Sequence, residues 1–233
     1  MQDVKNVVFV HGAWADSSSW SKLVPLLQAK RLHAVAVQNP LSSIADDVAS
    51  TNRLINAQDG PVLLVGHSYG GAVITEAGNN PKVAGLVYVA AFAPEEGETL
   101  GGMAQKFPPT PGLAEIQPIE DGFLLLTPKG VLESFAQDLK PEEKNLVLAT
   151  QGATPIKKAA WHSKPSWSVI ASNDRMISPE QESSTAKRMG AKILTLPGSL
   201  HPMLSHPEEV ADFVIEAASS LAGTPAAAAA KAH

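Results

Sequence analysis

The sequence Gly66-His67-Ser68-Tyr69-Gly70-Gly71 follows the apolar run Pro61–Val65, which we interpret as a buried strand. A strand that ends in Gly-x-Ser-x-Gly and continues into a helix is typical of a nucleophile elbow. Gly66 and Gly70 flank Ser68 where a Cβ atom would collide with the neighbouring backbone. The tight turn raises the Ser68 hydroxyl above the edge of the sheet, within reach of a substrate and of a histidine. The hexapeptide therefore predicts hydrolysis through a covalent serine intermediate.

A serine nucleophile needs a base within hydrogen-bond reach and an acid that orients this base. With this type of turn, the serine, the acid and the histidine follow one another along the chain, each at the carboxyl end of a strand. The strand-like run Ser166–Ala171 leads into a polar turn that contains Asp174, which we predict to be the acid. One alternative is a turn-capping role for Asp174. Another is an acid among the clustered glutamates after the preceding strand, Glu95, Glu96 and Glu98.

The base is expected after the last strand-like run, where a short loop precedes the final helix. This loop contains His201, which we predict to be the catalytic base. His206 is the alternative, but Ser205 and Pro207 beside it indicate the start of a helix, where Ser205 or His206 would serve as a cap.

A tetrahedral intermediate is stabilised by two backbone N–H groups aimed at its developing negative charge. We predict that one is the amide of Tyr69, which directly follows the nucleophile at a helix N-terminus, where the helix dipole favours negative charge. The loop after the first strand, His11-Gly12-Ala13-Trp14, supplies the second. We assign this donor to Ala13, because Gly12 permits the required turn. His11 precedes the nucleophile and is expected to brace the loop.

The elements that position these residues alternate between strand-like and helix-like segments. Six nearly continuous apolar runs, typical of strands covered on both faces, occupy Val7–Val10, Ala34–Gln38, Val62–Val65, Val83–Val89, Ser166–Ala171 and Lys192–Leu196. Helices are predicted at Ser19–Lys30, Ile44–Ala57, Tyr69–Asn79, Pro179–Met189 and Pro207–Leu221. This order predicts an α/β fold with a doubly wound, mainly parallel sheet of about six strands.

Residues 94–164 depart from this alternation, because they are rich in proline and contain apolar clusters. About 70 structureless residues are uncommon in a compact domain, so we predict a small cap, rather than a surface loop, inserted into a single domain of residues 1–222. The alanine-rich residues 223–233 are predicted to be a frayed tail. The aromatic residues predicted to line a substrate pocket are Trp14, Phe107, Phe123 and Trp161. The three that lie in the cap could instead form its own core.

Composition narrows the possible classes of function. The 233 residues carry a formal net charge of −5 without a basic patch, which argues against nucleic acid as a partner. Cysteine is absent and no metal-binding or nucleotide-binding motif occurs, so we expect neither a metal nor a cofactor. No apolar stretch approaches ~20 residues and no secretory signal is found, which predicts a cytoplasmic protein without a membrane partner. The expected partner is a small-molecule ester, and the choice between monomer and homodimer stays open.

The chain resembles the α/β-hydrolase superfamily, and within it the group of plant methyl-ester esterases, plant hydroxynitrile lyases and related bacterial esterases. The matching stretches are Phe9–Trp14, Gly66–Gly71, Lys164–Arg175 and Met203–Pro207. This resemblance implies the α/β-hydrolase fold, ester hydrolysis and the absence of a cofactor. It also implies a triad and a pair of oxyanion donors, at Ser68, Asp174, His201, Ala13 and Tyr69.

Two positions depart from the pattern of this group. Its catalytic histidine usually stands five residues before the position that matches Ser205, and Leu200 occupies that place here, with His201 one residue later. The lyases carry a threonine in the oxyanion loop and a lysine after the histidine, where this chain has Gly12 and Pro202. We therefore predict a cofactor-independent serine esterase. A lyase of the hydroxynitrile type and a ligand-binding receptor with little turnover are the alternatives.

Overall fold

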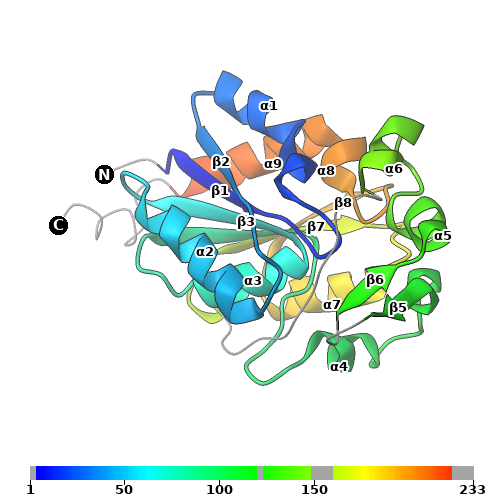
Figure 1. Cartoon of the computed structure of the whole chain (residues 1–233). Helices are drawn as coiled ribbons and strands as arrows, with labels where there is room; N and C mark the ends of the chain where they lie inside the picture. The colour runs from blue at the N-terminus through cyan, green and yellow to red at the C-terminus, as the bar shows by residue number, and fades with distance from the viewer. Residues whose placement is uncertain (1–3, 120–122, 148–159, 222–233) are drawn as a thin grey trace.

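The computed structural model describes residues 4–119, 123–147 and 160–221, and its main sheet has six strands (Figure 1). The order across the sheet is β2-β1-β3-β4-β7-β8, and every neighbouring pair is parallel. The strands are β1 (Asn6–Val10), β2 (His33–Val37), β3 (Val62–Ser68), β4 (Val83–Ala91), β7 (Ser166–Ala171) and β8 (Lys192–Leu196). Each predicted strand is present, which confirms the doubly wound α/β fold.

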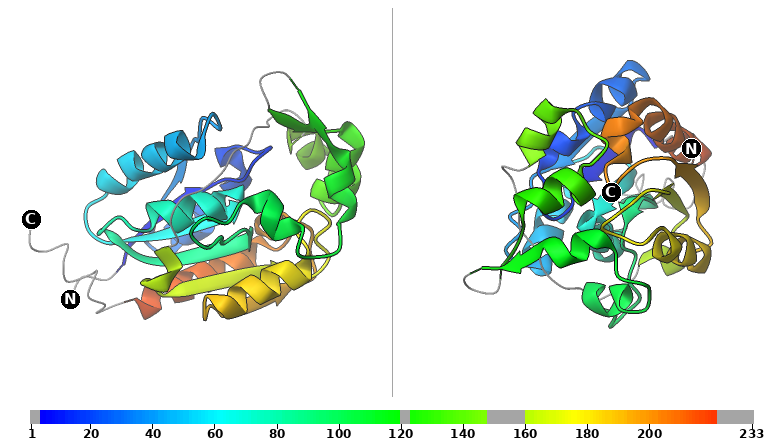
Figure 2. Two further views of the ribbon diagram at one scale, coloured as in Figure 1. Left: turned by 90° about the horizontal axis from the view of Figure 1, so that it is seen from below. Right: turned by 90° about the vertical axis from the view of Figure 1, so that its right-hand side faces the viewer.

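Helices cover both faces of the sheet, as the continuous apolar character of its central strands requires. α1 and α9 pack against each other on one face, and α2 and α3 pack on the other (Figures 1 and 2). Side chains of β1 alternate between the two resulting cores, with Val7 and Phe9 in one and Val8 and Val10 in the other. The helices, including α7 on β7, are α1 (Leu23–Ala29), α2 (Ile44–Asn56), α3 (Tyr69–Ala77), α7 (Pro179–Arg188) and α9 (Pro207–Ser220).

The segment predicted as one helix, Ser19–Lys30, forms two shorter elements. A 3-10 helix spans Ser17–Trp20, and α1 begins only at Leu23. Pro25 explains the division, because its ring and its missing N–H are tolerated only in the first turn of a helix. The apolar stripe of this segment, formed by Trp20, Leu23 and Leu27, is nevertheless buried in the core.

Short elements between β4 and β7 lie together at one end of the sheet and are called the cap here (Figures 1 and 2). They are α4 (Leu100–Ala104), a 3-10 helix (Pro111–Glu115), β5 (Ile116–Pro118), β6 (Leu124–Leu126), α5 (Pro128–Gly130), a π-helical turn (Val131–Phe135) and α6 (Pro141–Val147). A further 3-10 helix in this interval, Ala160–His162, lies apart from them and packs against α3. β5 and β6 pair as an antiparallel hairpin, which is too short to leave a periodic signal in the sequence. The predicted limits 94–164 stay a prediction, and residues 148–159 and the tail 223–233 lie outside the described residues.

The turn from β3 into α3 places Ser68 at the carboxyl edge of the sheet. Ser68 has a φ of 51° and a ψ of −120°, a backbone conformation that residues other than glycine rarely adopt. A Cβ atom on Gly66 would lie 2.5 Å from the carbonyl oxygen of Gly70, and one on Gly70 would lie 2.3 Å from the carbonyl oxygen of Val10. The two flanking positions therefore admit only glycine, as the motif predicts.

We expect Gly70→Ala to lower the free energy of unfolding by about 1–3 kcal/mol or more, because the added methyl group must displace backbone atoms. Urea denaturation measures the change. The matched control is Gly101→Ala in α4, where an added Cβ meets no atom within 4 Å. This control should gain about 0.5–1 kcal/mol from helix propensity. Equal unfolding midpoints for the two variants would contradict the close approach at the elbow.

Candidate active site

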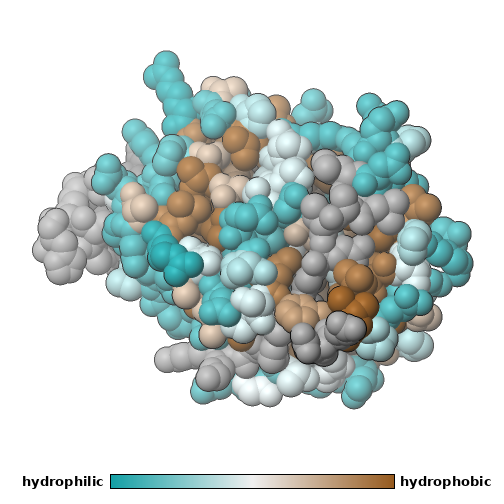
Figure 3. All heavy atoms as spheres, in the orientation of Figure 1, coloured by the Kyte–Doolittle hydropathy of each residue, from teal (hydrophilic) through white to brown (hydrophobic). Residues whose placement is uncertain are grey.

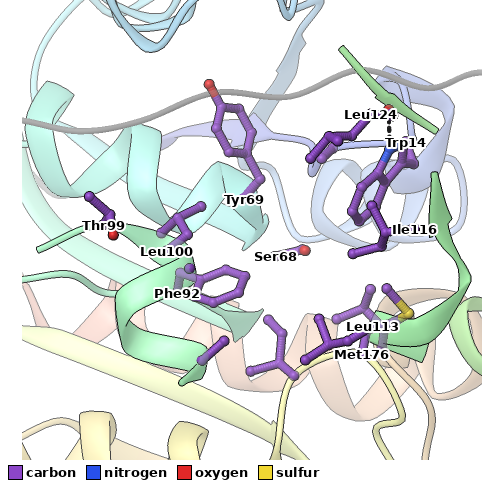
Figure 4. Close-up of a pocket in the computed structure, with 15 residues that line it drawn as sticks. Trp14, Ser68, Tyr69, Phe92, Thr99, Leu100, Leu113, Ile116, Leu124 and Met176 are labelled. Atoms are coloured by element: carbon purple, nitrogen blue, oxygen red, sulfur yellow. Dashed lines mark hydrogen bonds between the residues drawn. The ribbon is translucent and has the colours of Figure 1, made fainter. Parts of the chain in front are cut away.

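An apolar cavity of about 340 Å³ lies between the carboxyl ends of the strands and the cap, with Ser68 in its wall (Figure 4). Loops that follow five different strands contribute to this wall. The residues on it are Ala13, Trp14, Ser68, Tyr69, Phe92, Thr99, Leu100, Gly101, Ala104, Leu113, Ile116, Leu124, Met176, Ile177 and Leu200. On the molecular surface, apolar side chains also gather over β5 and β6, where Phe123 and Leu125 are partly exposed (Figure 3).

The predicted nucleophile and both predicted oxyanion donors lie together in this wall. The loop that carries Ala13 rests against the elbow, since a Cβ atom on Gly12 would lie 2.9 Å from Cβ of Ser68. Nδ1–H of the buried His11 donates to the carbonyl oxygen of Gly12 at 2.9 Å, which braces the loop. Tyr69 is the first residue of α3, at the positive end of the helix dipole. The local chain conformation therefore suits two amides aimed at one point beside Ser68.

A buried hydrogen bond fixes the side chain of Tyr69. Its hydroxyl donates to Oδ2 of Asp47 in α2 at 2.7 Å, and the amide of Leu41 donates to Oδ1 of the same carboxyl group at 2.9 Å. Burial raises the pKa of Asp47, and the hydrogen bonds from Tyr69 and Leu41 oppose this rise. The residue after the nucleophile is thus anchored to a fully buried carboxylate on a neighbouring helix.

His201, the predicted base, is fully buried but does not line the cavity, whereas its neighbour Leu200 does. Nδ1–H of His201 donates to the carbonyl oxygen of Phe135 at 2.8 Å, which leaves Nε2 as the unprotonated nitrogen. Within the described part of the chain, Nε2 has no hydrogen-bond partner, and no hydrogen bond joins His201 to Ser68. Burial lowers the pKa of His201 to about 4, against the opposing effects of the Phe135 bond and the Asp138 charge. The imidazole is therefore neutral at pH 7.

Asp174, the predicted acid, is buried in the turn after β7. Its Oδ1 accepts the amides of Met176 and Ile177 at 2.7 and 3.0 Å, and both of these residues line the cavity. Burial raises the pKa of Asp174 to about 7, and the two amide bonds oppose this rise. No hydrogen bond among the described residues joins Asp174 to His201. The structure therefore brings Asp174 to the rim of the site without linking it to the imidazole.

Four hydrogen bonds hold the loop that contains His201, called the histidine loop here, in its present position. Asp138 of the cap accepts the amide of Ser199 at 2.8 Å, and it also accepts the Ser199 hydroxyl. Nε2–H of His67, on the elbow, donates to the carbonyl oxygen of Leu200 at 2.7 Å. The bond from His201 to the Phe135 carbonyl oxygen is the fourth. The loop is thus tied to the cap on one side and to β3 on the other, and the short helix α8 (Pro202–Ser205) follows it.

Two carboxyl groups near the site were not singled out by sequence reasoning. Asp138 faces the histidine loop from the cap, and Glu182 of α7 is buried against Asp174. Neither residue belongs to a motif, and only packing between distant segments brings them here. The sequence therefore offers no local signal that would have found them.

The alternative acids and the alternative base have other partners. Glu98 pairs with Arg188, and Glu95 pairs with His162. None of the three clustered glutamates lines the cavity. His206 directly precedes α9, as a residue at a helix start, and it does not line the cavity either.

Of the four aromatic residues predicted to form the pocket, Trp14 lines the cavity (Figure 4). Its φ of 55° is unusual for a bulky residue, and its Nε1–H donates to the carbonyl oxygen of Leu124 in β6 at 2.8 Å. The other three lie elsewhere. Phe107 borders a smaller hollow beside α7, Phe123 is partly exposed, and Trp161 packs in the core with its Nε1–H bonded to the Pro94 carbonyl oxygen. Composition suggested a pocket, but it cannot tell which side of the cap an aromatic residue faces.

Residues 7–213 match the Alpha/beta hydrolase family, and the chain belongs to this family. It is similar to the carbendazim hydrolyzing esterase of Nocardioides sp. (strain SG-4G), with 32% identity over 43% of this chain and 48% of that protein. This match therefore spans about half the length of the relative. The alpha/beta hydrolase nvfD of Aspergillus novofumigatus (strain IBT 16806) is 27% identical over 91% of this chain and 96% of its own length.

Solved structures share the fold as well. A pyrethroid hydrolase from Sphingobium faniae JZ-2 superimposes with a TM-score of 0.77 and 23% identity, over 92% of this chain and 97% of that one. At this identity the likeness concerns the fold. The relatives named here are esterases and hydrolases.

Within the described residues, no group of three or more His, Cys, Asp or Glu side chains is arranged to hold a metal ion. A search of the same residues finds no helix with both the length and the apolar character that crossing a bilayer demands.

The chain's two tyrosines allow a matched test of the anchor under the elbow. We expect Tyr69→Phe to lower the free energy of unfolding by about 1–3 kcal/mol, because the buried Asp47 carboxyl loses a donor. Tyr88→Phe is the control, since the Tyr88 hydroxyl is equally buried but bonds to the neutral Thr75 hydroxyl at 2.9 Å. This second loss should cost only about 0.5–1.5 kcal/mol. Chemical denaturation at pH 7 compares the variants, and a larger loss for Tyr88→Phe would contradict the charged anchor.

Proposed function

We propose that this chain is a serine carboxylic ester hydrolase that acts without a cofactor on neutral, apolar esters. The observation that carries the proposal is the position of Ser68, on a strained elbow in the wall of an apolar cavity. Strain at a single residue that faces a cavity is a recurrent feature of catalytic sites. The hydrolytic relatives add to this support.

In the proposed reaction, Ser68 Oγ attacks the ester carbonyl carbon while Nε2 of His201 takes the hydroxyl proton. The amides of Ala13 and Tyr69 hold the negative charge of the tetrahedral oxygen. The alcohol then leaves with the proton from His201. Water, activated by the same imidazole, releases the acid from Ser68. Asp174 orients the imidazole and stabilises its charged form.

This mechanism requires the histidine loop to move, so that His201 exchanges places with Leu200 in the cavity wall. Two features of the present position favour such a role. The neutral imidazole already carries its proton on Nδ1, which leaves Nε2 as the acceptor that a general base needs. Oδ2 of Asp174 accepts no N–H donor from the described residues, and it can accept one from an arriving Nδ1–H.

The cavity indicates the class of ester. No Lys, Arg, His, Asp or Glu side chain is among the described residues that line it, and Ser68, Tyr69 and Thr99 are its polar members. A charged acyl or alcohol group would lose its hydration there without gaining a partner. We infer an uncharged, hydrophobic substrate of moderate size. The absence of a lining cation also gives a cyanide leaving group no partner, so the lyase alternative gains no support.

A second candidate function is ligand binding with little turnover, and one observation favours it. Leu200, rather than an imidazole, faces the cavity that contains Ser68. In its present position His201 is bonded to a backbone carbonyl group. A cavity with a nucleophile but without an adjacent base would bind an apolar ester and cleave it slowly.

Ser68→Ala tests the nucleophile that hydrolysis requires. With a p-nitrophenyl acyl ester, we expect kcat/KM to fall at least about 10³-fold, because no other group can form the acyl intermediate. Ser219→Ala, an exposed position on α9, should leave the rate unchanged. Activity of Ser68→Ala within tenfold of the wild type would exclude the mechanism.

Variants at the histidine loop separate the two candidates. If His201 serves as the base, His201→Ala should lower kcat by about 10²–10⁴-fold with little change in KM. If the chain only binds its ligand, the wild-type turnover is already minimal, and His201→Ala should leave it unchanged. Leu200→His would place an imidazole in the cavity wall, and we expect it to raise turnover at least about tenfold in either case. Leu200→Gln is the control for polarity alone, and an equal gain in both Leu200 variants would refute an acid–base role for this position.

A further inference from the structure

Glu182 is a buried acidic residue that the proposed mechanism does not use. It lies on α7 with 3% of its surface exposed, and Asp174 beside it has 6% exposed. The amide of Ala171 donates to Oε2 of Glu182 at 3.3 Å, just as the amides of the acid turn donate to Oδ1 of Asp174. The second oxygen of each carboxyl group, Oε1 of Glu182 and Oδ2 of Asp174, receives no N–H or hydroxyl donor from the residues that the structure describes. The two residues lie next to each other around Ala171, whose amide donates to Glu182 and whose carbonyl oxygen accepts the Asp174 amide at 3.1 Å, and each carboxyl group affects the pKa of the other.

Two neighbouring carboxylates cannot both stay ionised when neither is solvated. A single proton between them removes the repulsion and gives both unpartnered oxygens a hydrogen bond, with one group as the donor and the other as the acceptor. Burial, and then the charge of Asp174, raises the pKa of Glu182 well above its usual range. Asp174 has two amide donors that stabilise its charge and Glu182 has one, so the proton belongs on Glu182.

We propose that Glu182 keeps a proton at neutral pH and donates it to Oδ2 of Asp174, which makes Glu182 a positioning residue for the turn that carries Asp174. This turn also supplies Met176 and Ile177 to the cavity wall. The hydrogen bond made by the shared proton therefore fixes the position of one wall of the cavity. This holds whether the protein hydrolyses the ligand in the cavity or only binds it. Oδ2 keeps a second lone pair for an imidazole, so the pair is compatible with the proposed triad.

Other charged groups around the pair do not replace the proton. Asp138 of the cap adds a negative charge that acts on Asp174. The guanidinium of Arg175 donates to the Glu133 carbonyl oxygen, and that of Arg188 donates to the Ala93 carbonyl oxygen and to Glu98. Glu180, in the first turn of α7, is exposed. Among the described residues, no cation is therefore bonded to either carboxyl group.

The shared proton makes stability depend on pH in a direction opposite to that of an ordinary ion-paired carboxylate. In the unfolded chain both groups lose their protons near pH 4, whereas the folded pair holds one proton to higher pH. The folded state thus binds more protons than the unfolded state above about pH 4. Its stability therefore falls as the pH rises from about pH 4 to the pKa of the shared proton in the folded pair, and it stays constant above that pKa.

Urea denaturation of the full chain between pH 5 and pH 9 tests the proposal with the variant Glu182→Gln. The glutamine amide can donate permanently to Oδ2 of Asp174, while its carbonyl oxygen accepts the Ala171 amide. We expect the wild-type midpoint to fall with rising pH and the Glu182→Gln midpoint to lose at least about half of that slope. Glu180→Gln is the matched control and should keep the wild-type slope. Equal slopes for the wild type and Glu182→Gln would overturn the proposal.

A measurement on the wild-type protein covers the case in which Glu182→Gln does not fold. The infrared spectrum should contain the carbonyl stretch of a protonated carboxyl group at pH 7. Absence of the band at pH 7 would refute the shared proton. Neither experiment measures turnover, so a failed esterase assay and a failed proton assignment remain distinguishable.

Discussion

The close approach of backbones at the elbow is the constraint on which the rest of the structure depends. β3 must end and α3 must begin within one residue, and the space is so limited that Gly70 lies against the carbonyl oxygen of Val10. This packing joins the first and third strands at their carboxyl ends, and it presses the loop that carries Ala13 against Ser68. The positions of the candidate nucleophile and of both candidate oxyanion donors follow from one steric condition rather than from separate ones.

Burial away from water determines the pKa values, and hence the charge states, of the ionisable groups around that elbow. His201, Asp174 and Glu182 are all nearly inaccessible to water, and burial is the largest influence on the pKa of each. It lowers the pKa of the base and raises those of the acids, so both changes favour uncharged forms. An apolar cavity next to such groups suits chemistry in which charge develops only in the transition state, because preorganised dipoles act strongly in a site without water.

The parts of the fold that were predictable from the sequence are those that local rules determine. Continuous apolar runs located each strand of the sheet, and the Gly-x-Ser-x-Gly motif located the elbow. The start of α1 was misplaced because Pro25 was not weighed against the apolar stripe. The β5–β6 hairpin was missed because three-residue strands carry no period. Asp138 and Glu182 were missed because only tertiary packing brings them to the site, and the same holds for the side of the cap that Phe107, Phe123 and Trp161 face.

The order of two neighbouring residues, Leu200 and His201, decides how efficient the site can be. Bringing His201 into the cavity wall breaks its bond to the Phe135 carbonyl group, at about 0.5–1.5 kcal/mol, and removes Leu200 from apolar surroundings, at about 1.5–3 kcal/mol. The sum, about 2–4.5 kcal/mol, corresponds to a competent state in roughly one molecule in 30 to one in 2,000. Turnover would fall by the same fraction while ligand affinity stayed intact. In the proposed mechanism, hydrolysis and binding with slow turnover are therefore two ends of one conformational equilibrium, and its position depends on the hydrogen bonds of Asp138 and His67 to the histidine loop.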